Sequence, residues 1–346
     1  MTQSSSRAAG ADVTLSLGAR AMEILGFLRK HHERFISGAE ISRALRVSRT
    51  AVWKHVGSLR SAGFSIEAHP SQGYRLTEEP DLLLPADLQE GLQTRFVARE
   101  LHHLLSTDST NRVARDLAAK GAPEGTTVIA EAQTRGRGRL GRTWFSPPRT
   151  NLYASIILRP RIPMPSVPQL TLVGAVAACR AIGRVYNGPG ELGPRIKWPN
   201  DILMGGRKVS GTLVEAASLG EMLDYVVLGI GVNVNLEEKD LPTELAATAT
   251  SLLIAGGRKV SRKTLACALF EEIEATYERF RAEGFAKLSG EYAALSDIWG
   301  RQVRVTLSEG VIEGTAEGLD SDGALRVSLA GGASERILAG DVQLLR

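Results

Sequence analysis

The residues from Gln133 to Trp144 carry more potential chemistry than any other stretch of the chain. They read Gln-Thr-Arg-Gly-Arg-Gly-Arg-Leu-Gly-Arg-Thr-Trp, directly after a strand-like run that ends at Glu131. Glycines let a backbone approach a ligand closely or adopt positive φ, and arginines bind carboxylates and phosphates. We therefore predict an anion-binding loop. A flexible basic surface loop is the alternative.

The glycines of this loop fit the pattern G-x-G-x-x-G, but their surroundings exclude two common uses of it. A dinucleotide-binding turn opens a helix, whereas Thr143–Pro148 is aromatic and interrupted by prolines. A protein kinase needs His-Arg-Asp and Asp-Phe-Gly further along, and neither string occurs. All six histidines precede residue 104, which excludes a Ser-His-Asp triad or a histidine-bound metal in the large remainder. Chemistry there must depend on Lys, Arg, Asn, Asp and backbone amides.

The composition of the 346 residues, 43% hydrophobic and 23% charged, is typical of a globular protein with two or three domains. No apolar run approaches the roughly 18 residues of a membrane span, and the first residues lack the apolar centre of a signal peptide. We expect a cytoplasmic protein without a membrane partner. Cys179 and Cys267 lie in apolar helical contexts, which predicts core thiols and argues against a disulfide framework or a cysteine zinc site.

Positive charge is concentrated near the N-terminus. The segment from Arg20 to Arg75 contains ten Lys/Arg and four Asp/Glu, a local net charge of +6, whereas the net charge of the whole chain is only +4. Apolar spacing predicts three helices there, the third capped by Ser48, and two short strands around residues 69–72. This order predicts a winged helix-turn-helix whose third helix enters the DNA major groove. The candidate DNA contacts are Ser48, Arg49, Thr50, Lys54 and Arg75.

We place the domain boundaries from these patterns. Residues 1–16 form an expected disordered leader, 17–78 the winged helix, and 79–88 an acidic linker with a proline. Residues 89–297 mix strands with two long helices, at about 166–185 and 263–282. Alternating apolar residues and tight turns from 298 to 346 predict a small closed β-barrel.

Five motifs occur in order along the larger part of the chain. They are Asp108-Ser109-Thr110-Asn111, Gln133 with Gly136–Arg142, Lys197-Trp198-Pro199-Asn200-Asp201, Lys208 with Gly211, and Gly229-Ile230-Gly231-Val232-Asn233. Together they resemble the motifs of biotin-protein ligases. With the winged helix in front, residues 20–346 resemble the bifunctional bacterial ligases that are also biotin operon repressors. The resemblance implies an α+β multidomain fold: a winged helix-turn-helix, a class II aminoacyl-tRNA synthetase-like domain with a mixed sheet, and an SH3-like C-terminal β-barrel.

The resemblance also implies an activity. Biotin and ATP, with Mg²⁺, would give biotinyl-adenylate and pyrophosphate, and biotin would then pass to a lysine of the biotin carboxyl carrier protein of acetyl-CoA carboxylase. The adenylate-bound form would be a homodimer that binds operator DNA and represses biotin-synthesis genes. The residues agree with this chemistry, because activating a carboxylate needs positioning and charge neutralisation and no histidine.

The family's functional residues can be carried over to matching positions. Those implied for biotin are Ser109, Thr110, Asn111, Gln133, Gly136, Arg137, Gly138, Arg139, Lys208 and Gly211. Those implied for ATP and the adenylate are Arg137, Arg139, Arg142, Trp144, Asn200, Lys208 and Asn233. Lys208 and Arg139 are the catalytic candidates, and Asp201 is the candidate for organising Mg²⁺.

Several alternatives remain open. Trp144 and Trp198 could be core aromatics, Asn200 and Asp201 could form a turn after Pro199, and Lys208 could be a surface lysine. Two features depart from the family pattern: Leu140 stands where an additional basic residue is common, and residues 187–194 form a lengthened Gly- and Pro-rich connection. The competing functions are a ligase whose winged helix no longer regulates, a biotin sensor with an inactive catalytic domain, and a lipoate or octanoate ligase or transferase.

Overall fold

The computed structural model describes residues 16–186, 192–219, 222–307 and 309–345. Residues 1–15 of the expected leader and 187–191 of the lengthened connection lie outside the described residues. The chain divides into two compact units, which are described separately below. One contains residues up to Leu82 with His103–Thr107, and the other contains Leu83–His102 with the chain from Asp108 onward.

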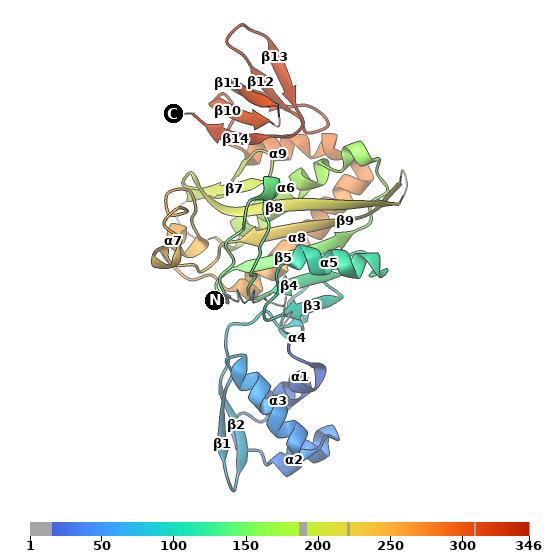
Figure 1. Ribbon diagram of the computed structural model, residues 1–346, viewed down its shortest axis with the longest axis vertical. Helices are drawn as coiled ribbons and strands as arrows, with labels where there is room; N and C mark the ends of the chain where they lie inside the picture. Colours follow the sequence, from blue (N-terminus) through green and yellow to red (C-terminus); the bar gives the residue numbers. More distant parts are fainter. Residues whose placement is uncertain (1–15, 187–191, 220–221, 308, 346) are drawn as a thin grey trace, which may run out of the picture. The chain divides into compact units, whose positions relative to one another are not determined.

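The first unit is a three-helix domain with a β-hairpin (Figure 1). Its elements are α1 (Ala19–Lys30), α2 (Gly38–Leu45), α3 (Arg49–Ser61), β1 (Ser65–His69) and β2 (Gly73–Glu78). The apolar face of α3 is buried at Val52, Val56 and Leu59, as the helical spacing predicts. The Ser48 hydroxyl accepts the Ala51 N–H at 3.1 Å and caps α3, a bond worth about 1 kcal/mol. The winged helix-turn-helix expectation is confirmed in its element order.

The second unit is built on a seven-stranded sheet in the order β3-β4-β5-β9-β8-β7-β6. Its strands are β3 (Leu101–Leu104), β4 (Thr127–Ala130), β5 (Leu152–Leu158), β6 (Arg195–Lys197), β7 (Asp201–Met204), β8 (Arg207–Leu219) and β9 (Met222–Val232). The pairings from β4 through to β6 are antiparallel. All seven residues of β5 are buried, which explains its continuous apolar sequence. The central strands β9 and β8 carry the functional site on one face.

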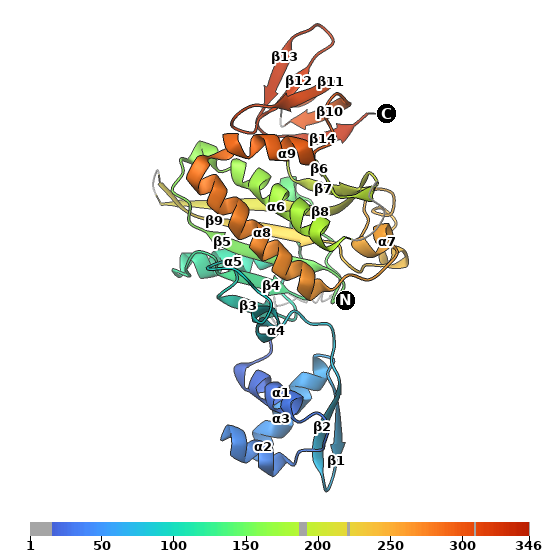
Figure 2. The same ribbon diagram turned by 180° about the vertical axis from the view of Figure 1, so that it is seen from behind.

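Helices cover both faces of this sheet. Figure 2 shows α6 (Gln169–Val185) and α8 (Arg262–Glu283) lying side by side across one face, and α5 (Thr110–Ala119) lies on the other. Short helices α4 (Pro85–Gln89), α7 (Leu252–Gly256) and α9 (Ser289–Leu295) complete the unit. Cys179 of α6 and Cys267 of α8 are free and buried, as predicted. Burial raises the pKa of the Cys179 thiol to about 12.

One expectation about α6 was wrong. Among the described residues, Met164–Val185 is long and apolar enough to cross a membrane, although the sequence analysis found no run of that length. In this stretch 67% of the apolar window is buried inside the protein, where α6 packs between α8 and the sheet. Its composition is therefore that of a core helix covered on several sides.

The C-terminal part of the second unit is a five-stranded antiparallel sheet in the order β13-β12-β11-β10-β14. Its strands are β10 (Gln302–Leu307), β11 (Gly310–Leu319), β12 (Leu325–Ser328), β13 (Ser334–Ile337) and β14 (Asp341–Leu344). Val303 and Val305 of β10 are buried while their neighbours are exposed, which is the alternation that predicted strands here. The α+β multidomain fold class is confirmed.

Candidate active site

A cavity of about 700 Å³ lies in the second unit, and its size is that of an organic ligand site. Its walls come from the start of α5, the glycine-rich loop (residues 133–144), strands β7 to β9, the segment after β9, and the C-terminal sheet. Segments more than 200 residues apart in the sequence therefore share one site. The two ends of the cavity differ in chemistry.

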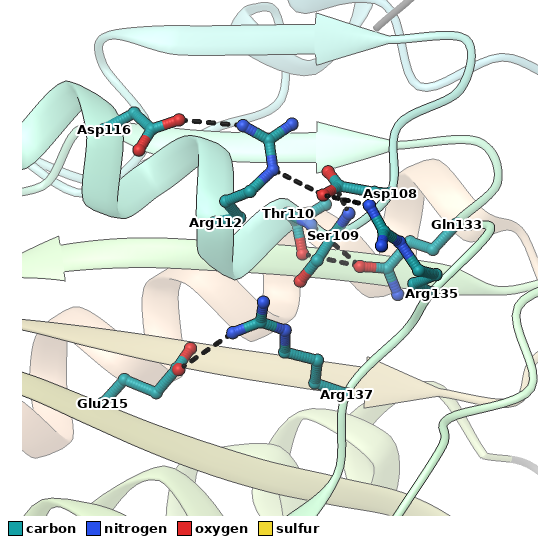
Figure 3. A network of polar contacts seen from close by, with 9 residues as sticks. All are labelled: Asp108, Ser109, Thr110, Arg112, Asp116, Gln133, Arg135, Arg137 and Glu215. Atoms are coloured by element: carbon teal, nitrogen blue, oxygen red, sulfur yellow. Dashed lines mark hydrogen bonds and ion pairs between the residues drawn. The ribbon is translucent and has the colours of Figure 1, made fainter. Parts of the chain in front are cut away.

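One end is lined by small uncharged side chains at the start of α5 (Figure 3). The Gln133 Oε1 accepts from the Thr110 backbone N–H at 2.9 Å and lies 3.1 Å from the Thr110 hydroxyl. The Gln133 Nε2 donates to the Ser146 hydroxyl at 3.0 Å. Thr110 is buried and Gln133 is half-buried, and these bonds fix both side chains.

Asn111 is held in one orientation at the same end. Its Oδ1 accepts from the Ser155 hydroxyl at 2.6 Å, and its Nδ2 donates to the Glu215 Oε2 at 2.7 Å. The amide lies against β9 at Gly229, where an added Cβ would come within 2.1 Å of the Asn111 Oδ1. This end therefore offers fixed uncharged donors and acceptors, which suit a neutral polar ring.

The other end of the cavity is cationic. Lys208 Nζ lies 2.6 Å from Asp201 Oδ1, and Lys197 Nζ lies 3.0 Å from Asp201 Oδ2. Burial acts to raise the pKa of Asp201, but the two lysines outweigh it and hold that pKa below its usual value. Two cations around one carboxylate leave an excess positive charge that favours an anionic ligand.

Trp144 lines the cavity beside both Lys208 and strand β9. Lys208 Nζ lies 5.2 Å from the centroid of its ring, within the range of a cation–π interaction. The indole lies against β9 at Gly231, where an added Cβ would come within 2.5 Å of the ring. Its Nε1 is buried without a hydrogen-bond partner among the described residues. Trp198, by contrast, is 1% exposed and donates its Nε1 to the Gly323 carbonyl at 3.1 Å, so it is a core aromatic.

The arginines of the glycine-rich loop reach different partners. Arg139 donates to Asn200 Oδ1 at 3.0 Å and to the Gly340 carbonyl at 3.3 Å. Burial lowers the pKa of Arg139, partly offset by nearby carboxylates. Arg142 donates to Asp341 Oδ2 at 2.7 Å, and this hydrogen bond raises the pKa of Arg142. The loop is thus attached to both the β6–β7 turn and the C-terminal sheet.

Apolar side chains from the segment after β9 complete the cavity. Asn233 lies among them, and its Nδ2 donates to the Thr250 carbonyl at 3.0 Å, which fixes this wall. The apolar residues of this segment that line the cavity include Leu236, Leu241, Leu245 and Ala249, and Phe145, next to Trp144 in the sequence, also lines the cavity. An apolar wall beside a cationic group can cover a flat aromatic base while its phosphates face the cations.

Comparisons with known proteins match three parts of the chain to known families. The Biotin/lipoate A/B protein ligase family matches residues 104–233, an HTH domain matches 20–75, and the Biotin protein ligase C terminal domain matches 298–345. The bifunctional ligase/repressor BirA of Bacillus subtilis (strain 168) is 40% identical over 312 residues, covering 90% of this chain and 94% of that protein. The chain belongs to the bifunctional ligase/repressor BirA family.

Other members of the BirA family agree with this assignment. The bifunctional ligase/repressor BirA of Escherichia coli (strain K12) is 32% identical over 291 residues, covering 84% of this chain and 87% of that protein. The biotin protein ligase of Aquifex aeolicus, solved in complex with biotin and ATP, is 30% identical with a TM-score of 0.61. The match covers 72% of this chain and 99% of the Aquifex aeolicus chain. The resemblance to biotin-protein ligases that the motifs indicated is therefore confirmed.

The predicted BirA-family ligand residues lie together in one place. All of them except Gly136 line the cavity, including the Mg²⁺ candidate Asp201. Gly136 is buried just outside the lining, and its carbonyl accepts the Trp144 N–H at 2.9 Å. Asn200 follows Pro199 in a turn, but its side chain is 8% exposed and lines the cavity, so it is more than a turn residue.

Sequence reasoning missed two carboxylates at this site. Glu215 could have been found, because alternation along β8 places it on the same face as Gly211, whose role was predicted. Asp341 gave no local signal, since it reaches Arg142 from 199 residues further along the chain. Only the packing of the C-terminal sheet brings it near.

The predicted DNA contacts of the first unit divide into two groups. Arg49, Thr50 and Lys54 are exposed on α3 beside Trp53, which is itself 69% exposed. Ser48 and Arg75 have partners inside the domain: Ser48 caps α3, and Arg75 pairs with Glu67 at 2.7 Å. The exposed face of α3 is therefore the stronger candidate for contact with DNA.

Proposed function

We propose that this protein activates biotin with ATP and transfers it to a lysine of the biotin carboxyl carrier protein of acetyl-CoA carboxylase. The observation that carries the proposal is the single cavity, which joins a fixed uncharged end to a cationic end around Lys208. Biotinyl-adenylate has the same polarity, with a neutral ureido ring at one end and a phosphate towards the other. A relative from Mycobacterium tuberculosis is named biotin--[acetyl-CoA-carboxylase] ligase, which supports the proposal.

Each end of the cavity takes one part of the adenylate. Thr110, Asn111 and Gln133 hydrogen-bond the ureido ring, whose polar groups need partners once buried. Trp144 and the apolar wall after β9 cover the adenine, with Asn233 holding that wall in place. The other residues assigned to the ligand are Ser109, Gly136, Arg137, Gly138, Arg142, Asn200 and Gly211.

The cationic end serves the bond-making step. An oxygen of the biotin carboxylate attacks the α-phosphorus of ATP, a new P–O bond forms, and the bond to pyrophosphate breaks. Lys208 and Arg139 neutralise the charge on the reacting oxygens and hold the two anions together. In the second step the acceptor amine attacks the acyl carbon, AMP leaves with the bonding electrons, and the amine loses a proton to solvent.

Mg²⁺ enters with the nucleotide in this proposal. Both Asp201 oxygens already accept from lysines, and the described residues include no cluster of three or more groups suited to hold a metal ion. Mg²⁺ is usually held by few protein ligands and by substrate phosphates, where it neutralises phosphate charge. We therefore assign Asp201 to holding Lys197 and Lys208.

The first unit supports a second activity, biotin-dependent repression at operator DNA. Its exposed α3 with Arg49 and Lys54 suits phosphate and base contacts in the major groove. The relatives from Bacillus subtilis and Escherichia coli are named ligase/repressors. We propose that adenylate binding favours a homodimer that binds the operator more tightly. Footprinting with and without biotin plus ATP tests this, and equal DNA affinity in both would contradict it.

The ligase activity is tested by mass. The protein is incubated with ATP, Mg²⁺, biotin and a biotin carboxyl carrier domain, and the carrier's mass is measured. A gain of one biotinyl group is expected, and lipoate in place of biotin should give no shift. An unmodified carrier would refute the proposal, and a lipoyl shift would assign the protein to lipoate ligation.

A further inference from the structure

Glu215 contacts Asn111 at the uncharged end of the cavity and Arg137 of the glycine-rich loop, although it does not itself line the cavity. Its Oε2 accepts from Asn111 Nδ2 at 2.7 Å. Its Oε1 lies 3.4 Å from Arg137 Nη1, the contact drawn in Figure 3. Arg115 of α5 also approaches Oε1, at 3.6 Å. We propose that Glu215 is a positioning residue that sets the orientation of Asn111 and tethers the glycine-rich loop. The inference rests on the proposed ligase function.

The orientation of the Asn111 amide is decided by Glu215. The carboxylate of Glu215 can only accept hydrogen bonds, so it draws the Nδ2 group and repels Oδ1. The Ser155 hydroxyl, itself fully buried, then donates to Oδ1. A reversed amide would place the Asn111 Oδ1 opposite the Glu215 carboxylate, two acceptors without a proton between them, which is unfavourable. Glu215 thereby fixes which donor and which acceptor the cavity presents to the ring.

The strand geometry explains how a residue outside the cavity reaches both groups. Glu215 pairs with Val227 in the β8–β9 register, two residues along β8 from the pair Leu213–Gly229 and therefore on the same face of the sheet. Asn111 of α5 lies against β9 at Gly229, so its amide comes within reach of Glu215 on the neighbouring strand β8. The Glu215 side chain is 23% exposed, which leaves room for the guanidinium of Arg137 above it. One carboxylate thus connects the ring-binding end to the loop.

Two substitutions separate the two roles. Glu215→Ala removes the acceptor for Asn111 and the charge that attracts Arg137. Glu215→Gln keeps an oxygen that can accept from Asn111 Nδ2 but removes the charge. We expect Glu215→Ala to weaken biotin binding about tenfold, measured by calorimetry without nucleotide, because it loses a charge-assisted hydrogen bond. Glu215→Gln should stay within about threefold of the unsubstituted protein.

The loop tether has a different readout. Both variants should release preformed biotinyl-adenylate several-fold faster, since both lose the ion pair with Arg137. Arg115→Ala is the matched control, because it removes a partner of the same carboxylate without touching the loop or Asn111. It should leave biotin affinity and adenylate release unchanged. Thermal unfolding of every variant checks that the fold is intact.

A double-substitution cycle gives the decisive result. If Glu215 acts through Asn111, Glu215→Ala should not weaken biotin binding further in an Asn111→Ala background. Full additivity, or an Arg115→Ala variant that matches Glu215→Ala, would overturn the inference. Before these variants are compared, the unsubstituted protein must be shown to transfer biotin to the carrier. Failure of that transfer would instead refute the proposed function.

Discussion

The basic side chains on α3 of the first unit and those lining the cavity of the second unit differ in whether a carboxylate pairs with them. On α3 of the first unit, Arg49 and Lys54 are exposed, and neither has a carboxylate partner among the described residues. In the cavity of the second unit, Lys208 pairs with Asp201, Arg142 with Asp341, and Arg137 with Glu215. The same residue types therefore serve two different purposes.

The ligands proposed for the two surfaces explain this difference. DNA phosphates lie in solvent and release counterions when cations approach, so exposed and unpaired side chains suit them. A cavity that positions two reacting anions needs cations in fixed places before the ligand arrives, and neighbouring carboxylates provide that order. Removing a paired cation from the cavity should therefore cost far more than removing an exposed cation from α3.

The largest effect is expected for Lys208→Ala. The substitution removes the charge next to the reacting oxygens, and biotin-dependent exchange of pyrophosphate into ATP should fall about 100- to 1,000-fold. Lys239→Ala is the matched control, since Lys239 is also paired, with Glu237 at 2.9 Å, but its side chain is 74% exposed. The control should exchange normally. Near-normal exchange by Lys208→Ala would mean that its role is misassigned.

A smaller effect is expected for Gly231→Ala. The new methyl group would lie within 2.5 Å of the Trp144 ring and push it from its place beside Lys208. Because a displacement of about 1 Å can cost a large factor in rate, kcat/KM for ATP should fall roughly 10- to 100-fold. Gly318→Ala, where no atom lies within 4 Å of the added carbon, should not change it. If both variants had the same kcat/KM for ATP, Trp144 would have no role in the site.

The smallest effect is expected on DNA binding. Arg49→Ala and Lys54→Ala should each weaken operator binding about fivefold and reduce the slope of log affinity against log salt by about one. Arg34→Ala in the same domain is the control, because Arg34 pairs with Glu40 at 2.5 Å. It should change neither quantity appreciably. An Arg34 effect as large as that of Arg49 would show that only the general charge matters.

Local patterns predicted the elements well, and long-range packing explains what they missed. Helical spacing and a serine cap identified α3, and alternation identified β10, because both signals lie within a few residues. The motifs identified the loop and Lys208, yet no local signal pointed to Asp341, since only the fold brings it to Arg142. The length of the apolar run at α6 was underestimated because a helix covered on several sides needs no polar stripe.

A crystal structure of the protein soaked with biotin and ATP tests the central claim most directly. The account predicts one biotinyl-adenylate in the cavity, with its ureido ring in hydrogen-bond contact with Thr110, Asn111 or Gln133. Its phosphate should lie within reach of Lys208 and Arg139. A vitamin bound outside this cavity, or a phosphate held away from both cations, would contradict it.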